Sequence, residues 1–403
     1  MSTYGSLLKT RGVGRIISAQ LVARFPGGML SLAFLMHVER IHDSYGAAGL
    51  VLAATSIGQA VAGPLTSRWM GVWGMRPVLV LTSIVCTVAV VAVALGDAGT
   101  SVPVFMALGL VAGLANPPVQ PAVRTIYPKM VNSKQLTPLF SLDASAQEII
   151  WVLGPVIATF LAIQVDTSAG ILVAAAFLVG GGAWFISSPE LGRVRIPRSK
   201  RRFGVVLGRP PVLLSTVVGF LLIAACSAIE AGVVAVYGHG GPEAGFVLAI
   251  FAVGSLIGGL SLGHIPLSPW AMARRLTIIL VGTALAAVWM QFAWLSVFLF
   301  LAGVGIAPAL AVLFAVVSSS VRFSDTAEAY GWVGTGQLIG AALGSAAAGF
   351  VIDAQGAQGA FVVAAVLLAV GTAIAAVFHR HSPDLRGRDA GPIPDTEPVA
   401  VIT

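Results

Sequence analysis

The chain has 403 residues, of which 57% are hydrophobic and only 10% are charged. Because ordinary soluble domains carry about 25% charged residues, this composition excludes a soluble globular protein and predicts an integral membrane protein. The formal net charge of +7 does not by itself indicate nucleic-acid binding, because the positions of the basic residues decide their role.

Apolar windows long enough to cross a bilayer recur from one end of the chain to the other. We expect twelve membrane spans, at residues 13–37, 45–66, 77–96, 101–122, 138–163, 168–188, 211–237, 244–262, 274–292, 295–319, 327–351 and 358–379. Only a short QFAW stretch separates the ninth span from the tenth, but one helix of that length would be about twice the bilayer thickness. The predicted fold class is therefore an all-α membrane protein with twelve transmembrane helices.

The basic residues are distributed asymmetrically about these spans. Arg24 lies inside the first span and Arg40 in the loop after it, whereas all the other lysines and arginines fall on one side of the predicted membrane. By the positive-inside rule, both termini are cytoplasmic and the protein is expected in the inner (plasma) membrane. The basic run RVRIPRSKRRFG, residues 193–204, is interpreted as a topology determinant or anionic-lipid contact, and no nucleic acid is expected as a partner.

The first span contains an intramembrane cation followed by a helix break. Arg24 precedes Pro26, Gly27 and Gly28, which remove a backbone donor and soften the helix. An ionisable residue inside a bilayer is costly unless it is paired or hydrated, and it therefore indicates function. The break is either part of a substrate site or a packing kink, and the sequence does not separate the two.

The polar run SRWMGVWGMR, between the second and third spans, resembles the signature loop of the major facilitator superfamily, Gly-x-Leu-x-Asp-x-x-Gly-x-Arg. Gly74 and Arg76 match that pattern, but Gly71 stands where the family has its Asp. The resemblance implies a tight surface turn that holds two halves closed on the inner side. Without the Asp we expect a weaker latch, or one in which Arg68 and Arg76 act on helix C-terminal carbonyls. Gly71→Asp should then strengthen closure, unless the loop is only a topology anchor.

The fourth and fifth spans supply further polar candidates. The interruption NPPVQP offers Asn116 and Gln120 as hydrogen-bonding groups. Arg124 follows near the membrane surface, where we expect a topology anchor, and Asp143 near the inner end of the fifth span is expected to cap a helix or lie at the surface. In the same span, VLGP resembles the exporter-associated motif of the superfamily through Gly154 and Pro155.

Glu148 is the acidic candidate for proton coupling. At about 1.5 Å per residue, Arg24 and Glu148 reach a similar depth from the same side, so we predict that they meet. Glu148 would take up and release a proton while Arg24 pairs with it or with a substrate anion. A permanent structural ion pair is the alternative.

The second half repeats features of the first. SIGQAVAGPLTSR, residues 56–68, aligns with AVGSLIGGLSLGH, residues 252–264, and keeps two glycines. We therefore expect two pseudo-symmetric six-helix bundles, at 1–190 and 211–380, joined by a basic linker at 191–210 and followed by a disordered cytoplasmic tail at 381–403. This duplication also fits the major facilitator resemblance.

Four residues of the second half are candidates for the transport pathway. Glu230 is a second protonation site or outer-gate residue, or else an acid reaching the external surface. Trp289, Trp332 and Gln337 either line an amphipathic pocket or face lipid and neighbouring helices.

No Walker loop, dinucleotide fingerprint or zinc motif occurs, so we expect no cofactor, no metal and no enzymatic activity. The preferred interpretation is a monomeric secondary transporter that works by alternating access, with a small-molecule substrate, protons and membrane lipids as partners. Proton-coupled efflux is preferred over uptake or facilitated diffusion of a metabolite or organic anion. A lipid-handling protein or membrane-embedded enzyme is the alternative class.

Overall fold

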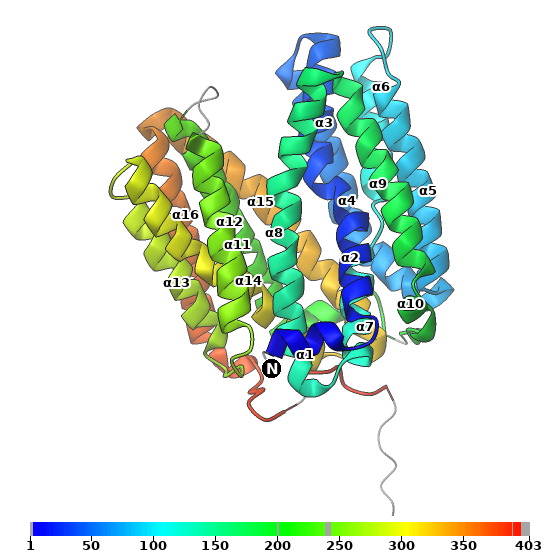
Figure 1. Cartoon of the computed structure of the whole chain (residues 1–403), viewed down its shortest axis with the longest axis vertical. Coiled ribbons are helices and arrows are strands. Elements are labelled where there is room, and N and C mark those ends of the chain that lie inside the picture. The colour runs from blue at the N-terminus through cyan, green and yellow to red at the C-terminus, as the bar shows by residue number, and fades with distance from the viewer. Residues whose placement is uncertain (1–2, 200, 238–242, 389, 396–403) are drawn as a thin grey trace, which may run out of the picture.

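The computed structural model describes residues 3–199, 201–237, 243–388 and 390–395, which are almost entirely helical (Figure 1). The first half contains α1 (Thr3–Lys9), α2 (Val13–Arg24), α3 (Pro26–His42), α4 (Tyr45–Trp73), α5 (Met75–Ala94), α6 (Val102–Leu114), α7 (Val119–Met130), α8 (Ser133–Gln164), α9 (Thr167–Ser187) and α10 (Pro189–Arg193). The second half contains η1 (Val205–Gly208), α11 (Pro210–Tyr237), α12 (Glu243–Leu262), α13 (Ala271–Ala286), α14 (Phe292–Ser320), η2 (Phe323–Asp325), α15 (Thr326–Gln355), α16 (Ala357–Val377) and η3 (His379–His381).

The predicted all-α fold with twelve spans is confirmed. Within the described residues, 11 helical segments are long and apolar enough to cross a membrane, and two of them, α2 with α3 and α6 with α7, are interrupted spans. The twelfth, α13, has only 16 residues but lies between α14 and α16. The chain does turn between α13 and α14, so the stretch around QFAW separates two helices as expected.

The two halves contact each other through a small set of helices. We call the end with α1, the α4–α5 turn and the linker between α10 and η1 the basal end, and the opposite end the distal end (Figure 1). Across the interface α4 packs against α15, and α8 packs against α12 and α14. Both ends of the described chain lie at the basal end.

The hydrophobic core shows that the halves are joined at the basal end. One cluster of buried side chains runs from basal residues of the first half, such as Ile16, Met70 and Phe140, into the whole second half. A separate cluster, which includes Met29, Val90 and Leu178, belongs to the first half alone and lies toward its distal end. Apolar contact between the halves is therefore concentrated at the basal end.

Glycines let the halves approach closely at the basal end. A Cβ at Gly331 of α15 would lie 2.8 Å from the carbonyl oxygen of Gly63 in α4. A Cβ at Gly259 of α12 would collide with the hydroxyl of Ser145 in α8. In lipid, where packing replaces the hydrophobic effect between helices, such close backbone contact is a main source of helix association.

The prediction of a disordered tail is wrong for the described residues beyond 381. The Ile393 N–H donates to the Val321 carbonyl at 2.9 Å, and the Phe323 N–H donates to the Ile393 carbonyl at 3.0 Å. Asp395 also accepts a 2.6 Å hydrogen bond from the Ser324 hydroxyl. Composition does not reveal this pairing because it joins two short, polar segments. Residues 389 and 396–403 lie outside the described part.

Candidate functional site

A buried polar cluster occupies the basal half of the first bundle, where α2, α7 and α8 meet. Arg24 lies at the end of α2, and its Nη1 donates to Gln20 Oε1 at 2.8 Å and lies 3.4 Å from Asp143 Oδ1. Its Nη2 donates to Gln147 Oε1. Gln20 also donates to Asp143 at 3.0 Å, so one carboxylate of α8 organises the polar end of α2.

Arg124 binds the other oxygen of the same carboxylate. Its Nε donates to Asp143 Oδ2 at 2.9 Å, and the Arg124 and Asp143 side chains are 3% and 0% exposed. The predictions of a surface anchor at Arg124 and of a cap or surface role for Asp143 are therefore wrong. The break before α7 turns Arg124 inward. There the Asp143 carboxylate, which Arg24 and Arg124 share, offsets part of the free-energy cost of removing both guanidinium groups from water.

Neutral amides complete the cluster. Gln147 Oε1 accepts a 3.4 Å hydrogen bond from Arg124 in addition to the one from Arg24. With its amide oxygen oriented by the network, Gln120 accepts from both terminal nitrogens of Arg124, at 2.7 Å for Nη2. Gln120 is therefore placed beside Arg124 in the cluster, whereas Asn116 is exposed and lies outside it, and a transport role for either stays a prediction.

The predicted pairing of Arg24 with Glu148 is wrong. Asp143 and Gln147 are four residues apart and share one face of α8, whereas Glu148 is rotated by about 100° from Gln147. Glu148 instead accepts a 2.9 Å hydrogen bond from the Ser255 hydroxyl on α12. This intramembrane carboxyl therefore lies at the interface between the two halves.

A second acid faces the same region from the other bundle. Glu230, on α11, interacts electrostatically with Glu148, and the Cys226 thiol lies within range of both carboxyl groups. The Glu230 side chain is exposed. Within the described part of the chain, no group of three His, Cys, Asp or Glu side chains could hold a metal ion.

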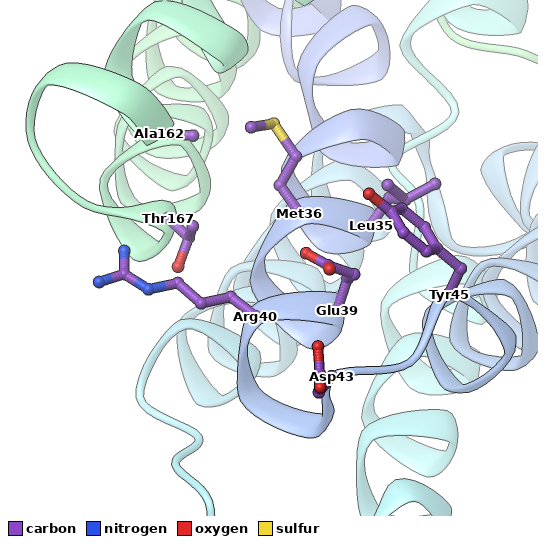
Figure 2. A pocket seen from close by; sticks show the side chains of 8 residues that line it. All are labelled: Leu35, Met36, Glu39, Arg40, Asp43, Tyr45, Ala162 and Thr167. Carbon is purple, nitrogen blue, oxygen red and sulfur yellow. The ribbon is translucent and has the colours of Figure 1, made fainter.

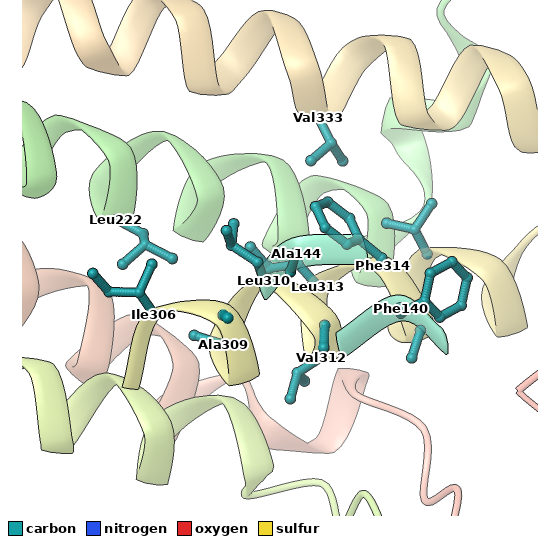
Figure 3. Close-up of a cluster of buried hydrophobic side chains, with 14 of the residues drawn as sticks. Phe140, Ala144, Leu222, Ile306, Ala309, Leu310, Val312, Leu313, Phe314 and Val333 are labelled. Carbon is teal, nitrogen blue, oxygen red and sulfur yellow. The ribbon is translucent and has the colours of Figure 1, made fainter. Parts of the chain in front are cut away.

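Aromatic rings from both halves close the basal end beside the arginines. Tyr127 of α7 and Phe140 of α8 have ring centroids 5.9 Å apart, and Phe140 lies 6.4 Å from both Phe314 of α14 and Tyr330 of α15. The Tyr330 hydroxyl donates to the Phe314 carbonyl at 3.0 Å. Figure 3 shows Phe140 and Ala144 of the first half among the apolar side chains of the second. We call these four rings the aromatic seal.

Arg124 connects the polar cluster to the aromatic seal. Its guanidinium carbon lies 3.4 Å from the centroid of the Phe314 ring, a cation–π contact that crosses the interface. Separation of the two halves at the basal end would break this contact, so the position of the Arg124 side chain and closure of the seal are physically linked.

The basal end of α4 forms a second inter-half contact, and the start of α5 binds the neighbouring end of α9. Arg68 Nη1 binds Glu328 Oε2 of α15 at 2.6 Å, and its Nη2 donates to the carbonyl of Arg201 in the linker. Arg76 donates to the carbonyls of Ile186 at 3.0 Å and Ser188 at 3.2 Å, at the end of α9. The expectation of contact with helix C-terminal carbonyls is thus confirmed for Arg76 and wrong for Arg68, which pairs with a carboxylate.

Gly71 is explained by the linker. A Cβ at this position would lie 3.2 Å from the carbonyl oxygen of Pro197 and 3.6 Å from Ile196. A carboxylate introduced there would face a carbonyl oxygen and would displace the linker. Gly71→Asp is therefore expected to loosen the basal contact, the reverse of the expectation from the loop pattern alone.

Breaking the Arg68–Glu328 pair should weaken basal closure. In Glu328→Gln we expect a loss of about 1–2 kcal/mol, or about a tenfold shift in the population of the basal-closed state, because a charge-assisted hydrogen bond becomes a neutral one. The rate at which a thiol reagent modifies a basal-interface cysteine measures this shift. Glu243→Gln is the matched control, since Glu243 is exposed at the start of α12. Equal labelling rates in the two variants would contradict a latch role for the pair.

The other predicted site residues are not brought together. Trp289 is 58% exposed beside Trp294 near the distal α13–α14 turn. Trp332 lies under the Phe203 ring of the linker, and Gln337 contacts Gly219 between α15 and α11. These three side chains lie against different elements of the described structure, and a role for any of them in the transport pathway stays a prediction.

The break in the first span lies at Phe25. Pro26 begins α3, and Gly27 has open space around it. Gly28 packs tightly on α8, because a Cβ at Gly28 would overlap the carbonyl of Ile150 and a Cβ at Gly154 would overlap the backbone of Gly28. The packing interpretation accounts for Gly28, and a substrate role for the break stays a prediction.

Two pockets lie away from this cluster. One of about 490 Å³, at the distal end of the first half, is lined by residues that include Glu39, Arg40, Asp43 and Thr167 (Figure 2). Arg40 there pairs with the exposed Asp166 at 3.1 Å. The other, about 680 Å³ and mainly apolar, runs between α5 and α9 with Arg76 at its edge.

Sequence reasoning missed Gln20, Gln147 and the four rings of the aromatic seal. The amides had a usable signal, because Gln20 with Arg24 and Asp143 with Gln147 are each spaced by four residues and share a helix face. The aromatic residues had none, since apolar rings are ordinary in membrane helices and only their meeting across the interface sets them apart.

The chain matches the family model described as Major Facilitator Superfamily over residues 16–293 and 241–400. It belongs to the major facilitator superfamily. No curated protein gives a significant sequence match. The recognition of the family from the α4–α5 loop is therefore confirmed, and the protein is a multi-pass membrane transporter, with a family assignment that points away from an enzyme.

Solved structures of superfamily members share the fold at low sequence identity. A bacterial homologue of the iron transporter ferroportin in its outward-facing state has a TM-score of 0.72 at 14% identity, over 92% of this chain and 100% of that chain. The human organic anion transporter MFSD10 (TETRAN) gives 0.70 at 17% identity, over 91% and 99%. The proton:xylose symporter XylE bound to 6-bromo-6-deoxy-D-glucose gives 0.70 at 13% identity, over 94% and 97%.

Proposed function

We propose that this protein is a proton-coupled secondary transporter that moves a small organic solute by alternating access, with efflux as its direction. The observation that carries the proposal is the position of Glu148. This intramembrane carboxyl binds Ser255 of the opposite half and interacts with Glu230, so its environment changes whenever the halves move. A carboxyl that is exposed to one side and then the other can carry a proton across.

The orientation follows from the basic residues. Arg15, Arg68, Arg76, Lys129 and Arg201 belong to the basal end, and by the positive-inside rule this end is cytoplasmic, in the inner (plasma) membrane. The conformation is then open to the outside and closed to the cytoplasm. One structural neighbour, the bacterial ferroportin homologue, is also described as outward-facing.

The coupling cycle uses the two contacts at Glu148 and Arg124. In the outward-open state a proton reaches Glu148 from the distal side, and Ser255 holds the carboxyl across the interface. When the basal end opens, the bond to Ser255 and the contact of Arg124 with Phe314 are both broken. The proton then leaves Glu148 for the cytoplasm, and the solute enters the binding site from the cytoplasm. Each half completes part of this pathway, so a monomer is the proposed working unit.

Efflux is supported by the exporter-type motif remnant. Gly154 packs directly on Gly28, with a Cβ position 2.6 Å from the Gly28 backbone, so the motif joins α8 to the broken first span. Uptake or facilitated diffusion of an organic anion is the second candidate, and the surplus of arginine over aspartate in the buried cluster favours it. Two structural neighbours are named as an organic anion transporter and a proton:xylose symporter.

Proton flux in liposomes tests the proposal. The purified protein is reconstituted with a dye that reports internal pH, and drugs, sugars, amino acids and organic anions are added in turn. Proton movement triggered by one of these compounds, absent from protein-free liposomes, is the expected result. Protein-dependent uptake of a labelled compound without proton movement would replace the proposal with a facilitator.

A further inference from the structure

The geometry points to an aromatic carboxylate as the substrate class, with its carboxylate bound between Arg24 and Arg124. The inference rests on the proposed transport function and names the chemistry that this site would recognise. Three observations carry it: a surplus positive charge, an unsatisfied hydroxyl donor and an adjoining aromatic surface.

The first observation is the charge of the cluster. Two guanidinium groups, from Arg24 and Arg124, share the single carboxylate of Asp143, which is completely buried. The remaining positive charge faces neutral groups, namely the amide oxygens of Gln20, Gln120 and Gln147 and the ring of Phe314. Burial of an uncompensated charge has a large desolvation free energy, and neutral amides offset only part of it. A bound monoanion would therefore neutralise the remaining charge of the site.

The second observation is the hydroxyl group of Tyr127. Tyr127 is fully buried, and its hydroxyl lies within electrostatic range of Asp143, Arg124 and Arg24. The Asp143 carboxylate is close enough to interact with this hydroxyl, but no acceptor among the described residues meets it in good hydrogen-bond geometry. A buried donor without an acceptor is unusual in a folded protein. A carboxylate between the arginines would accept from both guanidinium groups and from this hydroxyl.

The third observation is the apolar surface beside the arginines. The Phe314 ring lies against Arg124, and Phe140 and Tyr330 surround it. Aromatic rings prefer offset or edge-to-face contact with one another, so this surface suits an aromatic body attached to the anionic group. Because the same rings form the seal, a substrate bound here would contact the side chains that separate when the basal end opens.

Arg24 is the more exposed of the two arginines. Its side chain is 11% exposed, compared with 3% for Arg124. An incoming carboxylate therefore meets Arg24 first and displaces the Gln147 amide, which bridges the two arginines. Asp143 stays in place as the fixed counter-charge, so the site keeps a net preference for one negative charge.

Benzoate and benzamide test the inference, because they share a ring and size but differ in charge. In liposomes, we expect the wild-type protein to transport labelled benzoate at least about ten times as fast as benzamide. The reason is that charge-assisted hydrogen bonds are stronger than neutral ones. Arg24→Gln and Arg124→Gln should each abolish the preference. Arg40→Gln is the matched control, because Arg40 lies at the distal surface and pairs with Asp166.

Tyr127→Phe keeps the test decisive if the arginine variants fail to fold. The Tyr127 hydroxyl has no hydrogen-bond partner in good geometry among the described residues, so its removal disturbs the folded protein little. We expect a KM for benzoate several-fold higher, with benzamide unaffected. Equal transport of benzoate and benzamide by the wild type would overturn the inference, as would a benzoate preference that survives both arginine variants.

Accessibility labelling in the same liposomes separates failure of the inference from failure of the proposed function. A cysteine introduced as Ala144→Cys reports opening of the basal interface, because Ala144 is fully buried there. Basal opening without any benzoate preference would reject the substrate class alone. A cysteine that is never labelled from the basal side would reject alternating access itself.

Discussion

Glu148→Gln should abolish substrate-driven proton movement and leave exchange of substrate across the membrane largely intact. Glutamine keeps the size of the side chain and can still accept the hydrogen bond from Ser255, but it cannot release a proton. Proton flux is expected to fall to the level of protein-free liposomes. The two measurements are the internal pH signal and the exchange of labelled for unlabelled substrate, made on the same preparation.

Glu243→Gln serves as the control for Glu148→Gln. Glu243 is exposed at the distal start of α12 and binds nothing in the interface, so proton flux should match the wild type. Proton coupling that persists in Glu148→Gln would remove Glu148 from the mechanism. If proton flux were lost in Glu230→Gln instead, Glu230 of the second half would be the proton-carrying residue.

Gly331→Ala should prevent full closure of the basal end. The new Cβ would lie 2.8 Å from both the Gly63 carbonyl oxygen and the Pro64 Cα, and helix backbones cannot yield as a flexible side chain can. Overpacking of this kind is unfavourable by about 1–3 kcal/mol, which shifts the basal-closed population by about ten- to a hundredfold. The fold itself is retained, because the contact is made only when the halves meet.

Faster labelling of Ala144→Cys in the Gly331→Ala background is the measured sign of that shift, and the transport rate should fall with it. Gly334→Ala is a matched control one turn along α15, where a Cβ meets nothing within 4 Å. If both glycine variants are labelled at the same rate, close approach of α4 and α15 does not limit closure.

The arginines illustrate how far sequence reasoning reaches. Arg24 can be recognised from the sequence because a cation in an apolar span is costly wherever its partner lies. Its partner cannot be identified by depth alone, since depth depends on residue count whereas contact depends on helix rotation. Glu148 and Asp143 are on the same helix, and about 100° of rotation per residue decides that Asp143 faces Arg24 while Glu148 faces α12.

Gly71 illustrates the same limit near the basal end of α4. Gly74 and Arg76 carry enough of the family pattern to identify the superfamily, because a tight turn and a retained arginine are local requirements. The absence of a carboxylate at Gly71 has a tertiary cause, the Pro197 carbonyl of the linker, which is distant in sequence.

The sequence by itself determined the membrane class, the twelve-span fold and the family, because insertion into a bilayer depends on the length and polarity of each segment alone. Tertiary structure alone decided that Asp143 joins Arg24 to Arg124, that four rings seal the basal end, and that Glu148 spans the interface to Ser255. These contacts depend on the rotation of helices that are distant in sequence and on how closely they approach. Because a membrane helix is apolar on all sides, its sequence does not indicate which face contacts the neighbouring helices.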